Sequence, residues 1–193
     1  MYGTATLSYA NKIFLDVTGR NDWSSTLPSG NNSFFYPSVS TSFILSDLLR
    51  LPEQISFAKL RASWAQVGND TDPYKTAKYY NTSAFPGSAS VSPTLYNARF
   101  KPEISNSIEV GLDWRMFKQR FGLDLAFYNN ITRNQILDVP MDQTTGYTKA
   151  TMNSGKVRNR GIELQLDGTP VKTKNFTWNS TFTWAKNYNK VLS

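Results

Sequence analysis

Cysteine and histidine are both absent from this sequence of 193 residues, and each absence excludes a class of chemistry. Without cysteine there is no disulfide framework, no thiolate nucleophile and no cysteine-based zinc site. Without histidine the commonest general base and metal ligand is missing. We therefore expect that the protein is not an enzyme and that it holds no catalytic residue, no cofactor and no metal.

Long apolar runs are also missing. No run of about 18 apolar residues exists to cross a bilayer as a helix, and no signal peptide is recognisable at the start. The net charge is +7, an excess compatible with nucleic-acid binding. The basic residues are scattered along the chain, however, which favours an ordinary solvated surface and no nucleic-acid partner.

What the sequence does contain is an alternation of apolar and polar residues. Aromatic residues make up 14% of the chain and threonine, serine and asparagine are abundant, a composition that favours strands and turns. Alternation with a period of two predicts strands with one apolar and one polar face. Eight segments show it, at 4–9, 13–18, 38–45, 59–64, 108–114, 121–127, 153–168 and 176–184. The sequence predicts an all-β, antiparallel fold.

The connections between these segments are short and long in turn. Short ones lie at 10–12, 116–120 and 169–175, long ones at 19–33, 67–103 and 130–154, and the one at 46–56 is predicted to hold a helical turn. An up-and-down sheet then has all its long loops at one end, as transmembrane β-barrels do. A soluble or surface-exposed β-sandwich that binds carbohydrate stays open as the alternative, because sandwich strands alternate too.

Acidic residues of the predicted strands fall on their polar faces. In a water-filled or plugged lumen they stay hydrated or pair across strands, whereas a dry core would make them costly. We predict a lumen-facing polar wall of Asp16, Arg61, Glu109, Asp113, Asp124, Glu163 and Asp167. Four tryptophans of the apolar faces, placed near predicted strand ends, suggest the aromatic girdle of such a barrel: Trp64, Trp114, Trp178 and Trp184.

Candidate chemistry is sparse. Glu109 and Asp113 would lie roughly 13 Å apart along one strand, too far for a glycosidase pair. The stretch "NDTDP" (69–73) resembles the start of a calcium loop but lacks the glycine and distal glutamate of an EF-hand, so a loop calcium ion is weakly supported. Loop aromatics suit stacking on a sugar or peptide, with packing between loops or against a partner protein as the alternative. The candidates are Trp23, Tyr74, Tyr79, Tyr80, Phe85 and Tyr147.

Several stretches occur in an order typical of one family. They are "NDWSSTLP…FFYPSVSTSFILSD" (21–47), "KLRASWAQVGN" (59–69), "FKPEISNSIEVGLDWRMF" (100–117), "NSGKVRNRGIELQLDGTPVKTKNFTW" (153–178) and "NYNKVLS" (187–193). They resemble the C-terminal half of the SusC/RagA family of TonB-dependent outer-membrane receptors of Bacteroidetes-type bacteria. "GKVRNRGIEL" is the most specific of these motifs.

The resemblance implies that residues 1–193 are part of a plugged barrel of about 22 strands. The plug domain, the TonB box and the remaining strands would lie outside this chain, which depends on them because a barrel in lipid has no open edge. It implies import of a glycan or a peptide through the outer membrane of a Gram-negative, Bacteroidetes-type bacterium. A SusD-like surface lipoprotein and TonB would be its partners, and outer-membrane lipid and lipopolysaccharide its surroundings.

One strand leaves its register open. In a regular register, Lys156, Arg158 and Arg160 point outward with the apolar residues that follow them, which places the basic half at the lipid headgroups. A bulge at Gly161 would instead turn Arg158 and Arg160 toward the lumen. We favour the regular register.

Overall fold

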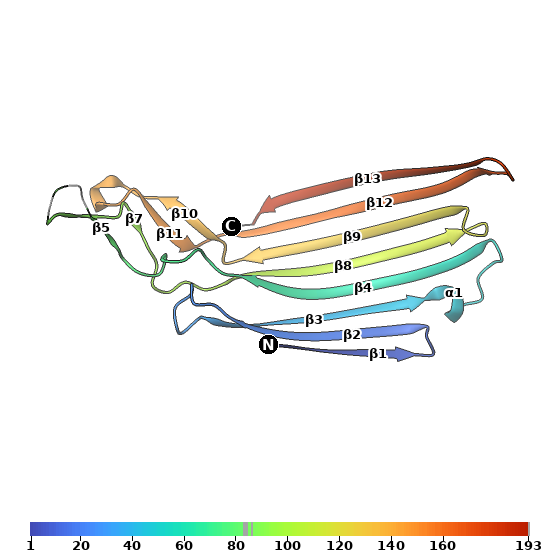
Figure 1. Ribbon diagram of the computed structural model, residues 1–193, viewed down its shortest axis with the longest axis horizontal. Coiled ribbons are helices and arrows are strands. Elements are labelled where there is room, and N and C mark those ends of the chain that lie inside the picture. The colour runs from blue at the N-terminus through green and yellow to red at the C-terminus, as the bar shows by residue number, and fades with distance from the viewer. Residues whose placement is uncertain (83–84, 86, 193) are drawn as a thin grey trace.

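Eight long strands form one antiparallel sheet in a computed structural model that describes residues 1–82, 85 and 87–192 (Figure 1). Strands that follow each other along the chain lie side by side, apart from the short strands of the loops. The all-β, antiparallel, up-and-down fold expected from the sequence is confirmed. In sheet order the strands are β1 (Tyr2–Tyr9), β2 (Ile13–Trp23), β3 (Ser33–Ile44), β4 (Ile55–Asn69), β8 (Glu103–Met116), β9 (Phe121–Arg133), β12 (Lys156–Lys172) and β13 (Thr177–Val191).

Each alternating segment lies mostly within one of these strands, although the segments at 38–45, 153–168 and 176–184 extend one to three residues beyond the strand, and most strands are longer than the alternation. β2 continues to Trp23 and β9 to Arg133, so the loops predicted at 19–33 and 130–154 are shorter than expected. Backbone pairing carries these extensions, for example between Asn21 and Phe35. For the same reason the predicted placement near strand ends is wrong for Trp64 and Trp184, which lie well inside β4 and β13. The aromatic girdle itself stays a prediction.

The short connections lie together at one end of the sheet (Figure 1). The β1–β2 turn is closed by the backbone N–H of Lys12, which donates to the carbonyl oxygen of Tyr9 at 2.9 Å. Between β3 and β4 the expected helical turn is present as α1 (Leu45–Leu48). No helix among the described residues is long and apolar enough to cross a membrane.

The long connections lie at the opposite end and contain strands that the sequence did not predict. β5 (Tyr80–Thr82) pairs with β6 (Ala89–Val91). A second, three-stranded sheet consists of β10 (Ile136–Pro140), β11 (Lys149–Asn153) and β7 (Thr94–Leu95). The loop between β10 and β11 contains the short helix η1 (Gln143–Thr145). These loops are therefore folded rather than irregular.

Hydrogen bonds tie the three long loops to one another. The Asn31 side chain donates to the carbonyl oxygen of Phe100, whose side chain is fully buried. The Asn153 side chain accepts from the backbone N–H of Lys101 and donates to its carbonyl oxygen. Segments from all three loops consequently meet above the end of the sheet.

The two faces of the sheet differ in chemistry. Residues paired across neighbouring strands share a face, and one row of pairs is apolar in every strand: Tyr9, Ile13, Phe43, Leu60, Leu112, Leu125, Leu164 and Trp184. We call this the apolar face and the opposite one the polar face. Few hydrophobic side chains of the described residues are buried, and many on the apolar face are exposed. A β-sandwich would divide the strands between two packed sheets, so that alternative is wrong.

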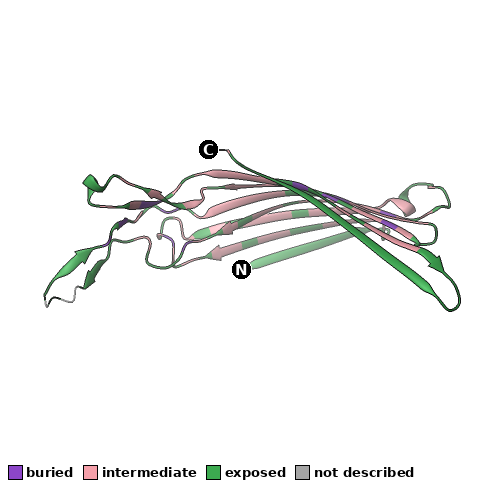
Figure 2. Cartoon of the chain, turned by 90° about the horizontal axis from the view of Figure 1, so that it is seen from above, coloured by how far each residue is buried: buried purple, intermediate pink, exposed green. Residues whose placement is uncertain are grey.

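The sheet is open at both sides. β1 and β13 are its edge strands, and every residue of both strands is exposed (Figure 2). Each edge leaves backbone N–H and C=O groups without a strand partner.

Candidate functional site

The seven residues predicted for the polar wall all lie on the polar face. Strand pairing connects them through common rows, such as the row that joins Asp16, Ser40, Ser63 and Glu109. That this face lines a lumen stays a prediction.

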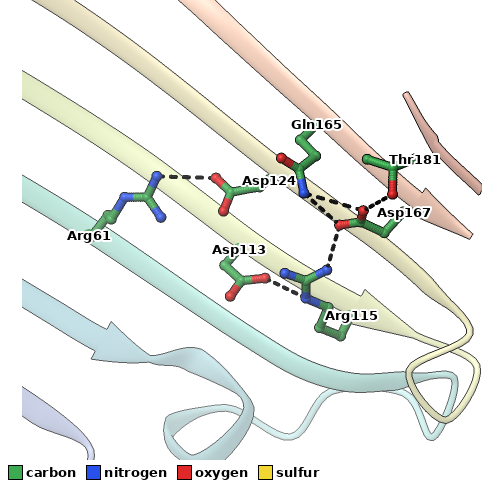
Figure 3. Close-up of polar contacts among 7 residues, drawn as sticks. All are labelled: Arg61, Asp113, Arg115, Asp124, Gln165, Asp167 and Thr181. Carbon is green, nitrogen blue, oxygen red and sulfur yellow. Dashed lines mark hydrogen bonds and ion pairs between the residues drawn. The ribbon is translucent and has the colours of Figure 1, made fainter. Parts of the chain in front are cut away.

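Two arginines join four of the wall's carboxylates, and Figure 3 draws their pairs with Asp113, Asp124 and Asp167. Arg61 Nη2 lies 3.1 Å from Asp124 Oδ1, and its Nε lies 3.9 Å from Glu109 Oε1. Arg115 Nε lies 2.9 Å from Asp113 Oδ1, and its Nη1 lies 3.2 Å from Asp167 Oδ2. Since these side chains are partly exposed, each pair contributes no more than about 1 kcal/mol. These ion pairs therefore matter more for the alignment of strands and side chains than for stability.

Three glycines make room for long side chains on the polar face. A Cβ at Gly111 would collide with the Arg61 guanidinium, and one at Gly122 with that of Arg115. A Cβ at Gly161 would lie 2.5 Å from Tyr128 Oη and 2.7 Å from the carbonyl oxygen of Lys186. In each case the strand next in the sheet has a glycine where a long side chain crosses it.

Gly161 therefore makes room for the Tyr128 side chain and does not mark a β-bulge. β12 pairs with β9 and with β13 without a register shift from Val157 to Gly168. The regular register favoured from the sequence is confirmed, and it puts Arg158 and Arg160 on the apolar face with Ile162 and Leu164.

Sequence reasoning missed Arg115 and the two neutral partners of Asp167. The side chains of Gln165 and Thr181 both donate to that carboxylate (Figure 3). Arg115 follows Asp113 by two residues and therefore shares its face. The sequence prediction missed Arg115 because the predicted strand ended at Trp114.

Four of the six candidate aromatics gather in the loops, and we call Tyr74, Tyr79, Tyr80 and Tyr147 the tyrosine cluster. The rings of Tyr74 and Tyr79 meet edge to face with centroids 5.8 Å apart. Lys78, which the sequence did not single out, lies with its Nζ 5.5 Å from the Tyr147 ring centroid and 5.9 Å from that of Tyr80. A hydrogen bond with Tyr147 raises the pKa of Lys78, so its ammonium is charged at neutral pH.

The cluster is open to solvent. Tyr74 is 73% exposed and Tyr80 63% exposed, so most of their surface is not used in packing the loops together. The other two candidates lie apart in the fold. Trp23 ends β2 opposite Ser33, on the apolar face, and Phe85 lies exposed between β5 and β6.

The two aspartates of the possible calcium loop are engaged by other groups. Asp70 accepts hydrogen bonds from the hydroxyls of Ser24 and Thr26, and Asp72 lies 2.7 Å from Lys75 Nζ. In the described part of the chain, no group of three or more Asp, Glu, His or Cys residues is placed to hold a metal ion.

Asp138 links the strands of the small loop sheet. It lies 2.6 Å from Lys149 Nζ and accepts a hydrogen bond of 2.6 Å from the Thr151 hydroxyl. Hydrogen bonds from Lys149 and then Thr151 lower the pKa of Asp138. A lowered pKa means that the ionised carboxylate stabilises the folded form above the ordinary carboxyl range, and that this contribution is lost as the pH falls through the folded pKa.

We expect the β10–β11 hairpin to lose protection as the pH falls below about 4. Amide hydrogen exchange of residues 149–153 in the full-length protein, corrected for intrinsic rates, measures this. Asp138→Asn should lower protection at neutral pH and make the further loss in acid smaller. Asp142→Asn is the control, because that carboxylate bonds within its own turn to the Thr144 N–H and hydroxyl. An unchanged acid response in Asp138→Asn would contradict the assignment.

Comparison with known proteins identifies the family. The family model described as "TonB dependent receptor-like, beta-barrel" matches residues 1–192. TonB-dependent receptor P26 of Formosa agariphila is 34% identical over 99% of this chain and 20% of the relative. TonB-dependent receptor SusC of Bacteroides thetaiotaomicron is 25% identical over 98% of this chain and 20% of SusC. The chain thus spans about a fifth of the length of these relatives.

Solved structures agree on the fold. The RagAB peptide transporter matches 98% of this chain and 22% of its own with a TM-score of 0.90 at 23% identity. The siderophore receptor PirA from Pseudomonas aeruginosa matches 96% of this chain and 33% of its own with a TM-score of 0.64 at 18% identity. The expected resemblance to SusC and RagA is confirmed.

Proposed function

We propose that this chain, which belongs to the family of TonB-dependent receptor-like β-barrels, forms part of the wall of an outer-membrane transporter for a large nutrient. One observation carries the proposal. A single eight-stranded sheet exposes an apolar face and pairs carboxylates with arginines on the opposite face, with folded loops gathered at one end. Such a sheet suits a wall between lipid and an aqueous lumen. In this role the chain binds and guides cargo and catalyses nothing.

The remainder of the barrel would be supplied by the rest of the receptor. Unpaired edges are not tolerated in lipid, so β1 and β13 would each pair with a further strand. A plug domain and a TonB box, also outside residues 1–193, would close the lumen and couple import to TonB. The chain would lie in the outer membrane of a Bacteroidetes-type bacterium, surrounded by outer-membrane lipid and lipopolysaccharide.

The loops would face the cell exterior and meet the cargo. RagAB is described as a peptide transporter, and a glycan or a peptide is the cargo that this chain's loops suit best. The tyrosine cluster offers exposed ring faces for stacking, and Lys78 adds a charged donor. A SusD-like lipoprotein would cover these loops as a lid. Trp23 and Phe85 remain candidate contacts. The position of Trp23 on the apolar face also suits an aromatic residue at the membrane–water interface.

Uptake by the intact receptor tests the function. Cells of the source bacterium, with and without the receptor gene, are given fluorescently labelled oligosaccharide and peptide mixtures, and a protonophore is added to a parallel culture. We expect entry of one class to require both the receptor and the energised membrane. Equal entry of both classes in the two strains, or recovery of the receptor outside the outer-membrane fraction, would refute the proposal.

Substitutions in the tyrosine cluster should weaken cargo binding. An aromatic contact is worth about 0.5–1.5 kcal/mol, so the double variant Tyr80→Ala/Tyr147→Ala should bind the imported mixture roughly tenfold less tightly. Calorimetry on the purified receptor with its lipoprotein measures the dissociation constant. Trp23→Ala is the comparison variant, and the position of Trp23 on the apolar face predicts a smaller loss than that of the double variant. A loss for Trp23→Ala but not for the double variant would reverse the assignment.

A further inference from the structure

Six basic residues gather at the loop end of the apolar face, and we call them the basic rim. β12 contributes Lys156, Arg158 and Arg160, β13 contributes Lys186 and Lys190, and β9 contributes Arg133. Strand pairing places them beside one another: Lys156 opposite Arg133, and Arg158 opposite Lys190. Paired residues on one face have Cβ atoms only about 5 Å apart. The rim is thus a compact patch of positive charge.

No carboxylate shares this face with the rim. Every Asp and Glu of the eight long strands lies on the polar face, namely Asp16, Asp22, Glu103, Glu109, Asp113, Asp124, Glu163 and Asp167. Among the described residues, none of the six rim cations takes part in an ion pair. The buried Nε of Arg158 also has no hydrogen-bond partner there. Charge is therefore segregated, and the positive charge of the rim is not neutralised by these strands.

The rim borders the apolar band directly. In β12 and β13 the apolar pairs Leu166–Phe182 and Leu164–Trp184 come just before it. Toward the loops the next pairs on this face are Ile162–Lys186 and Arg160–Tyr188, and the Arg160 guanidinium lies 5.3 Å from the Tyr188 ring centroid. A tyrosine beside cations at the end of an apolar band is typical of the membrane–water interface.

The apolar band runs obliquely across the sheet. In the row of pairs that contains Arg160, the side chains of β1, β2, β3, β4 and β8 are still apolar: Ala5, Val17, Val39, Trp64 and Ile108. Strands that are tilted in a membrane produce this shift, because a row of pairs then crosses the bilayer at an angle. In the proposed barrel, this shift would put the cations of β9, β12 and β13 beyond the hydrocarbon, at headgroup level.

We propose that the basic rim binds the phosphate groups of lipopolysaccharide in the outer leaflet. This inference rests on the proposed barrel and adds a specific lipid contact to it. Arginine binds phosphate through two parallel hydrogen bonds, and lysines beside it add charge without fixed geometry. The continuous register of β12 keeps Arg158 and Arg160 off the polar face, so cargo in the lumen is not their ligand.

Retention of lipid by the full-length receptor tests the rim. Wild-type receptor and the variant Arg158→Gln/Arg160→Gln/Lys190→Gln are compared by native mass spectrometry after titration with lipopolysaccharide and with its enzymatically dephosphorylated form. The control variant Lys118→Gln/Arg120→Gln/Lys174→Gln removes three cations from the opposite, short-turn end. We expect at least tenfold weaker binding for the rim variant only, and no difference between wild type and rim variant for dephosphorylated lipid.

Other outcomes would overturn the inference. These are equal binding by wild type and rim variant, an equal loss in the control variant, or wild-type binding that ignores dephosphorylation. The variant Arg158→Lys/Arg160→Lys keeps the charge and should assemble even if the triple variant does not. Its binding should fall between wild type and the triple variant, and binding equal to wild type would refute the forked contact. Uptake and membrane flotation of the same receptors report on the proposed function separately.

Discussion

Replacing Gly161 with valine is expected to destabilise the assembled receptor by about 2–3 kcal/mol, or to prevent its assembly. The added Cβ meets the hydroxyl of Tyr128, which can rotate away, and also the carbonyl oxygen of Lys186, which cannot. That oxygen belongs to the backbone of β13 next to Asn187, the residue paired with Gly161. Relief therefore requires breaking the β12–β13 ladder.

Urea unfolding of the full-length receptor in detergent, followed by its heat-dependent gel mobility, measures this effect. Gly168→Val on the same strand is the matched control, since the nearest atom to its added Cβ, Pro170 Cδ, is 3.9 Å away. The double variant Gly161→Ala/Tyr128→Ala should remain destabilised, because it removes only the side-chain part of the clash. Equal stability of the Gly161→Val and Gly168→Val receptors would contradict the packing described for Gly161.

Placing an arginine on the apolar face at Leu164 should have an effect of similar size. Leu164 lies in the row of pairs that is apolar in all eight strands. An arginine facing lipid near the bilayer midplane costs about 2–4 kcal/mol. We therefore expect Leu164→Arg to reduce the ratio of folded to unfolded receptor in lipid vesicles roughly 30-fold or more.

Gln165→Arg, one residue further along the same strand, is the control. Its side chain lies on the polar face beside Asp167, where a further cation meets carboxylates and water. Refolding into vesicles across a urea series compares the two variants under identical conditions. If both variants fold equally well, or if Gln165→Arg is the weaker, the apolar face does not contact lipid.

Most of the fold could be predicted from the alternation of apolar and polar residues. A period of two specifies which side chains share a face without any knowledge of the partners, so the wall residues from Asp16 to Asp167 could be grouped before their contacts were known. The acidic residues were expected to stay hydrated or to pair across strands, and Asp124 does pair with Arg61. Strand ends were less well predicted, as Trp64 illustrates, because backbone pairing continues where alternation stops.

The loops and the glycines could not be predicted in this way. Lys78 and Tyr147 meet across two loops that have no periodic pattern, and nothing local connects them. Gly161 looks like a bulge from its own strand, because the reason for it is Tyr128 on the neighbouring strand. Such contacts depend on the register between strands, which a single strand's sequence does not contain.

The two wall arginines have a consequence for how the strands find their partners. A slip of one strand by two residues keeps its apolar side chains on the same side, so alternation alone does not forbid it. Arg61 on β4 passes over β8 to reach β9, and Arg115 on β8 passes over β9 to reach β12. A two-residue slip would remove the glycine that lies beneath each arginine. It would also move the arginine's carboxylate partner out of reach. Each arginine can therefore form its ion pair across the sheet only when three successive strands are in register, which requires that the third strand has paired.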